Sequence, residues 1–261
     1  MRMFQACRLI GVVCLICHGV FAQTSASTTP DVASILRSSL AAQNGSIPIQ
    51  DIVLTGTAER IVGPDGETGP AQLKAVSSGS ARFDASLSAG IVTELRQVTS
   101  SGVSGAWSNG DGHSHLMAGH NMLTDAAWFF PMFVIQRLLS DPKASVTFVG
   151  IEGNLGHFQA AESAQTSGSV AESGQLAHWS QIDIYLDSAS LLPVRLSFNT
   201  HPDDNALLDI PVVVDFSSYE TLSGVTMPMH VQRSVNGTLQ MDIQLQSASF
   251  NTGLSSSAFQ F

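Results

Sequence analysis

Three histidines and an aspartate lie within a glycine-rich stretch, Asp111-Gly112-His113-Ser114-His115 and, after Gly119, His120. On an extended strand His113 and His115 would point to the same side, as two ligands of one metal ion must. A turn at Gly119 would let His120 supply a third nitrogen. Alternatively, the three are loop histidines that hydrogen-bond to the backbone or to water. A metal-binding protein or metal-dependent hydrolase built on His113, His115 and His120 is therefore one hypothesis.

Other polar groups give weaker signals for a reaction. His201-Pro202-Asp203-Asp204 combines a histidine with two acids, but its proline indicates a solvated loop. His157 and His178 lie near expected strand starts, where a histidine is usually structural. No serine lies in a Gly-x-Ser-x-Gly elbow, and no dinucleotide fingerprint is present. The sequence indicates no catalytic residue and no cofactor, so we expect a protein that is not an enzyme.

An aromatic run is the second candidate site. Ten consecutive apolar residues, 126–135, follow the helix-start signal Thr124-Asp125 and precede Pro142. We expect a central apolar helix over 124–141 that is kinked or restarted at Pro131. A helix that is apolar all round is either plain core or the lining of a cavity. In the second case an acyl chain would gain ~0.8 kcal/mol per buried methylene from Trp128, Phe129, Phe130, Met132 and Phe133.

The N-terminus has the pattern of a cleavable signal peptide over residues 1–22. Arg2 and Arg8 precede an uncharged apolar run of 13 residues, Leu9–Phe21, which is shorter than the ~20 residues that span a membrane. Cleavage after Ala22 would leave a single domain, 23–261, without a transmembrane span, in the periplasm or outside the cell. Cys7, Cys14 and Cys17 would be removed, so the mature chain would have no disulfide and no cysteine-ligated metal.

The charge balance argues against two classes of partner. Without Arg2 and Arg8 the chain has nine basic residues against 21 acidic ones, and the basic residues are scattered singly. No basic patch is available to neutralise a run of phosphates, which excludes nucleic acid as a partner. The same deficit argues against docking on anionic lipid head groups.

The hydrophobic pattern predicts an α+β, β-rich fold. Thr29-Pro30-Asp31 begins an amphipathic helix that ends at Asn44-Gly45. Strand-like segments follow from Gln50 onward, many of them with one apolar and one polar face. Such strands form a large curved antiparallel sheet, and we expect the N-terminal and central helices to cover its apolar face. Residues 163–175 contain few bulky side chains and are expected to form a mobile hairpin tip.

The last hairpin allows a detailed prediction. Apolar residues occupy the odd positions of both 225–231 and 239–245. Directly opposed residues share a face of the sheet, so odd positions must pair with odd positions. This pairing needs a loop of odd length and excludes a two-residue Asn-Gly turn. We therefore predict the three-residue loop Val235-Asn236-Gly237, with Gly237 left-handed in a bulge.

Three sequence stretches together resemble a known group of bacterial proteins. They are Trp128-Phe129-Phe130-Pro131, then Ile184-Tyr185-Leu186-Asp187 with Leu192-Pro193-Val194, and Phe216-Ser217-Ser218-Tyr219 with Gly224-Val225-Thr226-Met227-Pro228. The pattern resembles that of the periplasmic lipoprotein carriers, the LolA/LolB-like superfamily. The resemblance implies an incomplete barrel whose open side is plugged by helices and whose hollow accommodates acyl chains. It suggests a distant relative that binds a lipid or lipoprotein ligand.

Overall fold

The computed structural model describes residues 31–124, 129–162 and 170–260. The expected signal peptide, residues 1–22, lies outside the described residues, as do Thr29, Pro30 and Trp128.

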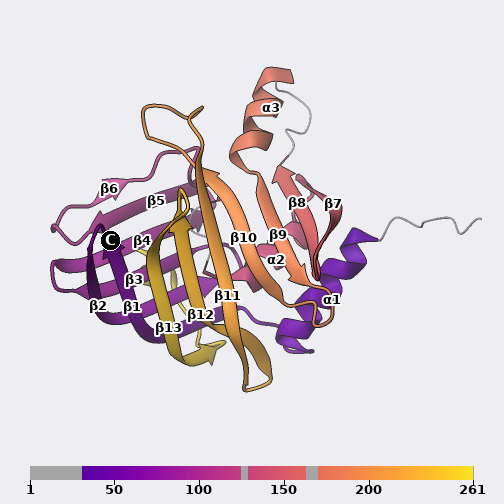
Figure 1. Cartoon of the computed structure of the whole chain (residues 1–261), viewed down its shortest axis with the longest axis horizontal. Helices are drawn as coiled ribbons and strands as arrows, with labels where there is room; N and C mark the ends of the chain where they lie inside the picture. The colour runs from indigo at the N-terminus through magenta and orange to yellow at the C-terminus, as the bar shows by residue number, and fades with distance from the viewer. Residues whose placement is uncertain (1–30, 125–128, 163–169, 261) are drawn as a thin grey trace, which may run out of the picture.

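One antiparallel sheet of thirteen strands dominates the structure (Figure 1). The strand order is β6-β5-β4-β3-β2-β1-β13-β12-β11-β10-β9-β8-β7. The strands are β1 (Asp51–Val62), β2 (Asp65–Val76), β3 (Ala81–Leu87), β4 (Gly90–Thr99), β5 (Gly102–Asn109), β6 (His115–Leu116), β7 (Ala144–Glu152), β8 (Leu155–Glu162), β9 (Ile182–Asp187), β10 (Pro193–Thr200), β11 (Ile210–Leu222), β12 (Val225–Val235) and β13 (Thr238–Phe250).

The sheet is strongly curved and does not close. It consists of two meanders, β1 to β6 and β7 to β13, which are joined where β1 pairs with β13. A register shift lies at Thr55/Gly56 in this seam. A Cβ atom on Gly56 would lie 2.1 Å from the carbonyl oxygen of Gln244, so only glycine allows this approach. The expected α+β fold with an incomplete antiparallel barrel is thereby confirmed.

Two helices cover part of the concave face (Figure 1). Helix α1 (Val32–Asn44) is followed by Gly45 with a positive φ, as the sequence predicted. Helix α2 (Pro131–Ser140) begins at Pro131, whose fixed φ and missing N–H suit a first helical turn. The expected restart at Pro131 is thereby confirmed, and Phe129 and Phe130 precede the helix, whereas residues 125–128 of the expected 124–141 lie outside the described residues. A short 3₁₀ turn, Ser256–Phe259, ends the described chain.

The region before β9 differs from the expectation. The predicted hairpin tip over 163–175 is wrong where it is described, because helix α3 (Val170–Trp179) occupies that part. Trp179 holds the C-terminal end of this helix against the loop that contains Ala206, because its indole Nε1 donates a hydrogen bond to the carbonyl oxygen of Ala206 at 2.8 Å. This contact reaches 27 residues along the chain, which explains why local composition did not reveal the helix.

The hairpin of β12 and β13 confirms half of its prediction. Val231 pairs with Ile243 and Arg233 with Met241, which is the expected odd-with-odd register. The loop prediction is wrong, because Val235 pairs with Thr238 around a two-residue turn. Asn236 and Gly237 both have positive φ, as a type I′ turn requires. A bulge restores the register, since Ser234 pairs with Leu239 and Gln240 is the extra residue.

The aromatic segment fills the core under the helices. Phe129, Phe130, Met132 and Phe133 are all buried, and the Phe129 ring stacks on Phe83 of β3 with centroids 4.9 Å apart. These side chains join one cluster with apolar residues of α1 and of both meanders. The cluster couples the helices to the sheet through dispersion contacts and apolar burial.

A buried carboxylate attaches the end of the chain to the start of β1. Asp51 accepts hydrogen bonds from the backbone N–H of Thr252 at 2.7 Å and of Gly253 at 2.8 Å. It also accepts one from the Thr252 hydroxyl at 2.7 Å. Burial alone would raise the pKa of Asp51, but these hydrogen bonds outweigh it and hold the pKa below its usual value.

We expect Asp51→Asn to lower the free energy of unfolding at neutral pH by about 1–3 kcal/mol, because donors would lose a buried charged acceptor. A carboxylate whose pKa is lowered by folding stabilises above its unfolded pKa, and this contribution disappears as the pH falls. The difference from wild type should therefore shrink below about pH 4. Urea unfolding at neutral and acidic pH measures this. Asp215→Asn, which removes an exposed partner of Arg195, is the control and should cost less than about 1 kcal/mol. An equal effect of both variants would contradict the prediction.

The core position of Phe129 gives a second prediction. Phe129→Ala should lower the free energy of unfolding by about 3–5 kcal/mol, because a buried ring is replaced by a void. Leu207→Ala, at a side chain that is 72% exposed, is the control and should change it by less than about 0.5 kcal/mol. Urea titration of both variants checks this, and wild-type stability of Phe129→Ala would show that the ring does not pack in the core.

Candidate functional site

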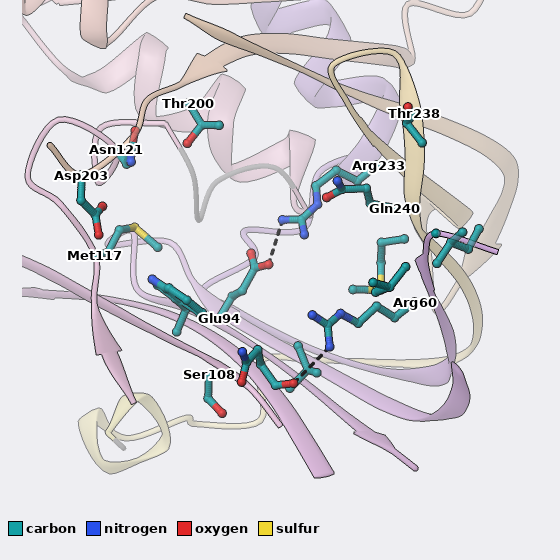
Figure 2. A pocket seen from close by; sticks show the side chains of 17 residues that line it. Arg60, Glu94, Ser108, Met117, Asn121, Thr200, Asp203, Arg233, Thr238 and Gln240 are labelled. Carbon is teal, nitrogen blue, oxygen red and sulfur yellow. Dashed lines mark hydrogen bonds and ion pairs between the residues drawn. The ribbon is translucent and has the colours of Figure 1, made fainter. Parts of the chain in front are cut away.

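A cavity of about 510 Å³ opens in the half of the concave face that the helices leave uncovered. Its walls come from β1, β4, β5, β12 and β13, together with Met117 and Asn121 from the connection after β6, Thr200 at the end of β10 and Asp203 in the loop that follows (Figure 2). The volume is within the range of about 300–1,000 Å³ that is typical of small-molecule sites. This cavity is the candidate functional site.

Two arginines lie in one row across the sheet within the cavity wall. Arg60 of β1 pairs with Met241 of β13, which in turn pairs with Arg233 of β12. Directly opposed residues share a face of the sheet, so both arginines and Met241 face the cavity. Figure 2 shows the two guanidinium groups pointing toward its middle from separate strands.

Glu94 of β4 meets this row from the opposite wall. Its Oε1 atom lies 2.8 Å from Nη1 of Arg233, and both side chains are more than four-fifths buried. Arg60 donates a hydrogen bond from Nη1 to the carbonyl oxygen of Asn109 at the end of β5, at 3.1 Å. These two contacts connect the walls of the hollow across its width (Figure 2). The cavity therefore has a charged interior, in which the guanidinium groups of Arg60 and Arg233 lie with the carboxylates of Glu94 and Asp203.

Apolar side chains form the rest of the lining. Trp107 lies directly opposite Glu94 in the pairing of β4 with β5, and its ring stacks on His115 with centroids 4.3 Å apart. The other apolar contributors are Ile61, Val62, Val92, Met117 and Met241. Val62 is 57% exposed, so apolar surface of the wall is in contact with solvent. The mixed lining suits a molecule that has both an apolar and a polar part.

The aromatic residues proposed from the sequence do not line this cavity. Phe130 and Phe133 border a space of about 40 Å³, and Phe129, Phe130 and Met132 border one of about 20 Å³, both far smaller than the cavity of about 510 Å³. Trp128 lies outside the described residues. These four side chains fill the covered half of the barrel because apolar surface from α1, α2 and the sheet converges on them.

The structure does not bring His113, His115 and His120 together as one group of metal ligands. His113 and His115 are exposed, and His115 stacks on Trp107. His120 instead packs beside Trp179 and His201, with ring centroids 6.0 and 5.6 Å away. Within the described ranges, the histidines and acids that approach one another closely enough for a shared ion are His178, His201 and Asp209.

His201 corrects the view of 201–204 as a solvated loop. Its side chain is fully buried, and its backbone exchanges two hydrogen bonds with the side chain of Asn121, at 2.8 and 2.9 Å. Burial lowers the pKa of His201 below its usual value, although the carboxylate of Asp209 acts in the opposite direction. The loop is fixed by a residue that lies 80 positions earlier in the chain.

Sequence reasoning did not identify Arg60, Glu94 and Arg233, because each is a single charge without a motif. A usable signal was present in the strand alternation. Arg233 occupies an odd position after the apolar odd positions of 225–231, and Arg60 follows Leu54 and Ala58 on the same face of β1. A charge on the inward face of an otherwise apolar strand marks a polar site inside the barrel.

Comparisons with known proteins identify the fold. No protein-family model and no curated protein matches the sequence. A putative outer-membrane lipoprotein-sorting protein domain from Vibrio parahaemolyticus is similar in structure, with a TM-score of 0.52 and 11% identity, covering 87% of this chain and 95% of that one. A DUF1329 family protein from Desulfovibrio piger has a TM-score of 0.52 and 12% identity, covering 89% of this chain and 98% of that one.

A LolA superfamily protein from Nitrosomonas europaea also matches, with a TM-score of 0.50 and 7% identity, covering 90% of this chain and 99% of that one. Among the described residues, helices long and apolar enough to cross a membrane are absent. The resemblance to the lipoprotein carriers noted in the sequence is confirmed at the level of the fold. The chain thus has the incomplete-barrel fold of the LolA-like and lipoprotein-sorting proteins.

Proposed function

We propose that this chain is an exported, non-enzymatic binding module that holds a lipid-like molecule or a lipoprotein acyl chain in the concave hollow of its sheet. The observation that carries the proposal is the 510 Å³ cavity, in which arginines and apolar side chains share one wall. The apolar part of a ligand would contact Val62, Val92 and Trp107. Its polar part would lie near Arg60 and Arg233.

Energetics support an amphiphilic ligand in this cavity. Each methylene removed from water contributes ~0.8 kcal/mol, so a few buried methylenes offset part of the cost of association. Two guanidinium groups favour an anionic end such as a carboxylate, because charge-assisted hydrogen bonds are stronger than neutral ones. The chain as a whole has a net charge of −10, so the two inward-facing arginines stand out against an acidic background.

The fold and the sequence add support for the setting. The similar structures include a domain described as a lipoprotein-sorting protein, which is consistent with a carrier or sensor of an acylated ligand. The basic and apolar pattern of residues 1–22 supports export to the periplasm or out of the cell.

A cavity-filling variant tests the proposal. The chain from residue 23 onward is titrated with cis-parinaric acid, a fluorescent fatty acid, and one saturable site is expected. Thr200→Phe should weaken binding about tenfold or more, because Thr200 lines the cavity and the added ring would occupy the ligand's space. Thr221→Phe, at an exposed position of β11 outside the lining, is the matched control and should bind as wild type does. Equal binding by both variants, or no saturable binding by wild type, would refute the proposal.

The charge on the cavity wall gives a separate prediction. Glu94→Gln removes the carboxylate beside Arg233. The fatty acid anion should therefore bind about threefold to tenfold more tightly, which corresponds to about 0.7–1.4 kcal/mol of binding free energy. The uncharged alcohol of the same chain length should bind unchanged in a displacement assay. Glu220→Gln makes the same change of charge at an exposed position and is the control. Tighter binding of both acid and alcohol would assign the effect to shape and count against charge recognition.

A further inference from the structure

A cluster of possible metal ligands lies next to the cavity, where α3 meets the loop between β10 and β11. His178 is near the C-terminal end of α3, and His201 and Asp209 stand at the two ends of that loop. The Nε2 atoms of His178 and His201 lie 3.0 and 3.1 Å from the same oxygen, Oδ1 of Asp209. One ligand atom from each residue lies within 4.8 Å of the others. Three donor atoms from two parts of the chain therefore converge on one small space.

The set of donors matches a particular kind of ion. Imidazole nitrogen together with carboxylate oxygen is a usual environment for Zn²⁺, whereas Ca²⁺ and Mg²⁺ prefer oxygen ligands alone. With bonds of about 2.0–2.1 Å, the edges of a tetrahedral zinc site are about 3.3 Å long. The two nitrogen–oxygen separations are close to such edges.

The burial of the cluster is also that of a coordination site. The side chain of His201 is fully buried, while His178 and Asp209 are 39% and 43% exposed. An ion can thus enter from solvent and rest against a rigid inner ligand. The exposed side leaves a fourth position for water, as in zinc sites that have three protein ligands.

A second observation comes from two buried nitrogens behind the cluster. Within the described part of the chain, Nδ1 of His201 and Nε2 of His120 are buried and have no hydrogen-bond partner. Their rings lie 5.6 Å apart and meet edge to face. A histidine that ligates a metal through Nε2 carries its proton on Nδ1, and that proton normally has an acceptor. The ring of His120, whose Nε2 also lacks a partner, lies directly beside that of His201.

We propose that His178, His201 and Asp209 form a binding site for Zn²⁺ or a similar divalent transition-metal ion that fastens α3 to the β10–β11 loop. The site adjoins the cavity but does not depend on its ligand. Thr200 and Asp203, on either side of His201 and Pro202, line the cavity, as does Asn121, which holds the backbone of His201. A bound ion would therefore hold one part of the cavity rim in place.

Zinc titration of the protein measures the site directly. The chain from residue 23 onward is treated with EDTA, dialysed, and titrated with Zn²⁺ by isothermal calorimetry at pH 7.5. We expect one saturable site per chain and a rise in Tm with Zn²⁺ concentration, because the ion binds the folded state. His178→Ala and Asp209→Asn should each weaken binding at least tenfold. Both positions are partly exposed, so the metal-free variants should unfold near the wild-type Tm.

A matched variant separates this site from other histidines. The double variant His113→Ala/His115→Ala also removes imidazoles, but from exposed positions away from the cluster, and should bind Zn²⁺ as wild type does. With Co²⁺ as the probe, wild type and this double variant should show the visible absorption of a low-coordinate site, and Asp209→Asn should lose it. The absence of saturable binding, binding that survives both ligand substitutions, or loss in the double variant would overturn the proposal. If His178→Ala fails to fold, Asp209→Asn decides the outcome.

Discussion

The structure depends on how the apolar concave face of one very wide sheet is shielded from water. Thirteen strands curve without closing, so the face cannot bury itself as it would in a complete barrel. In one half, α1, α2 and the rings around Phe129 and Phe133 supply the missing apolar contacts. In the other half, arginines, a glutamate and a tryptophan line an open hollow. The division into a filled half and an open half places the candidate site.

The pairing of β1 with β13 holds both halves together. It aligns Arg60 with Met241, the pairing of β13 with β12 adds Arg233 to the same row, and the bulge at Gln240 lies in the same wall. Bulges are frequent beside binding sites because they redirect side chains without interrupting the sheet. The feature that made the turn prediction wrong is thus part of the cavity.

Sequence reasoning succeeded where local alternation determines structure and failed where distant contacts do. The strand faces, the antiparallel sheet and the first helix followed from periodicity and capping residues. The parity of the apolar positions excluded the tight Asn236-Gly237 turn. That exclusion was wrong because a bulge, which parity does not reveal, restores the register. Likewise His201 was read as a solvated loop residue, although Asn121 fixes it in the interior from 80 positions away. The arginines of the cavity belong to no sequence motif. Only their strand positions, whose side chains point to the apolar, inner face of the sheet, distinguish them.

The seam between the meanders also has a kinetic consequence. The side chains of Thr55 and Ser247 meet across it although they are 192 positions apart, whereas the other strands of each meander pair with sequence neighbours. Local hairpins form quickly, but joining chain ends over such a span carries a large loop-closure entropy and is slow. Folding should therefore pass through two preformed meanders that dock last. A chain that emerges N-terminus first cannot complete its sheet until β13, the final strand, is free.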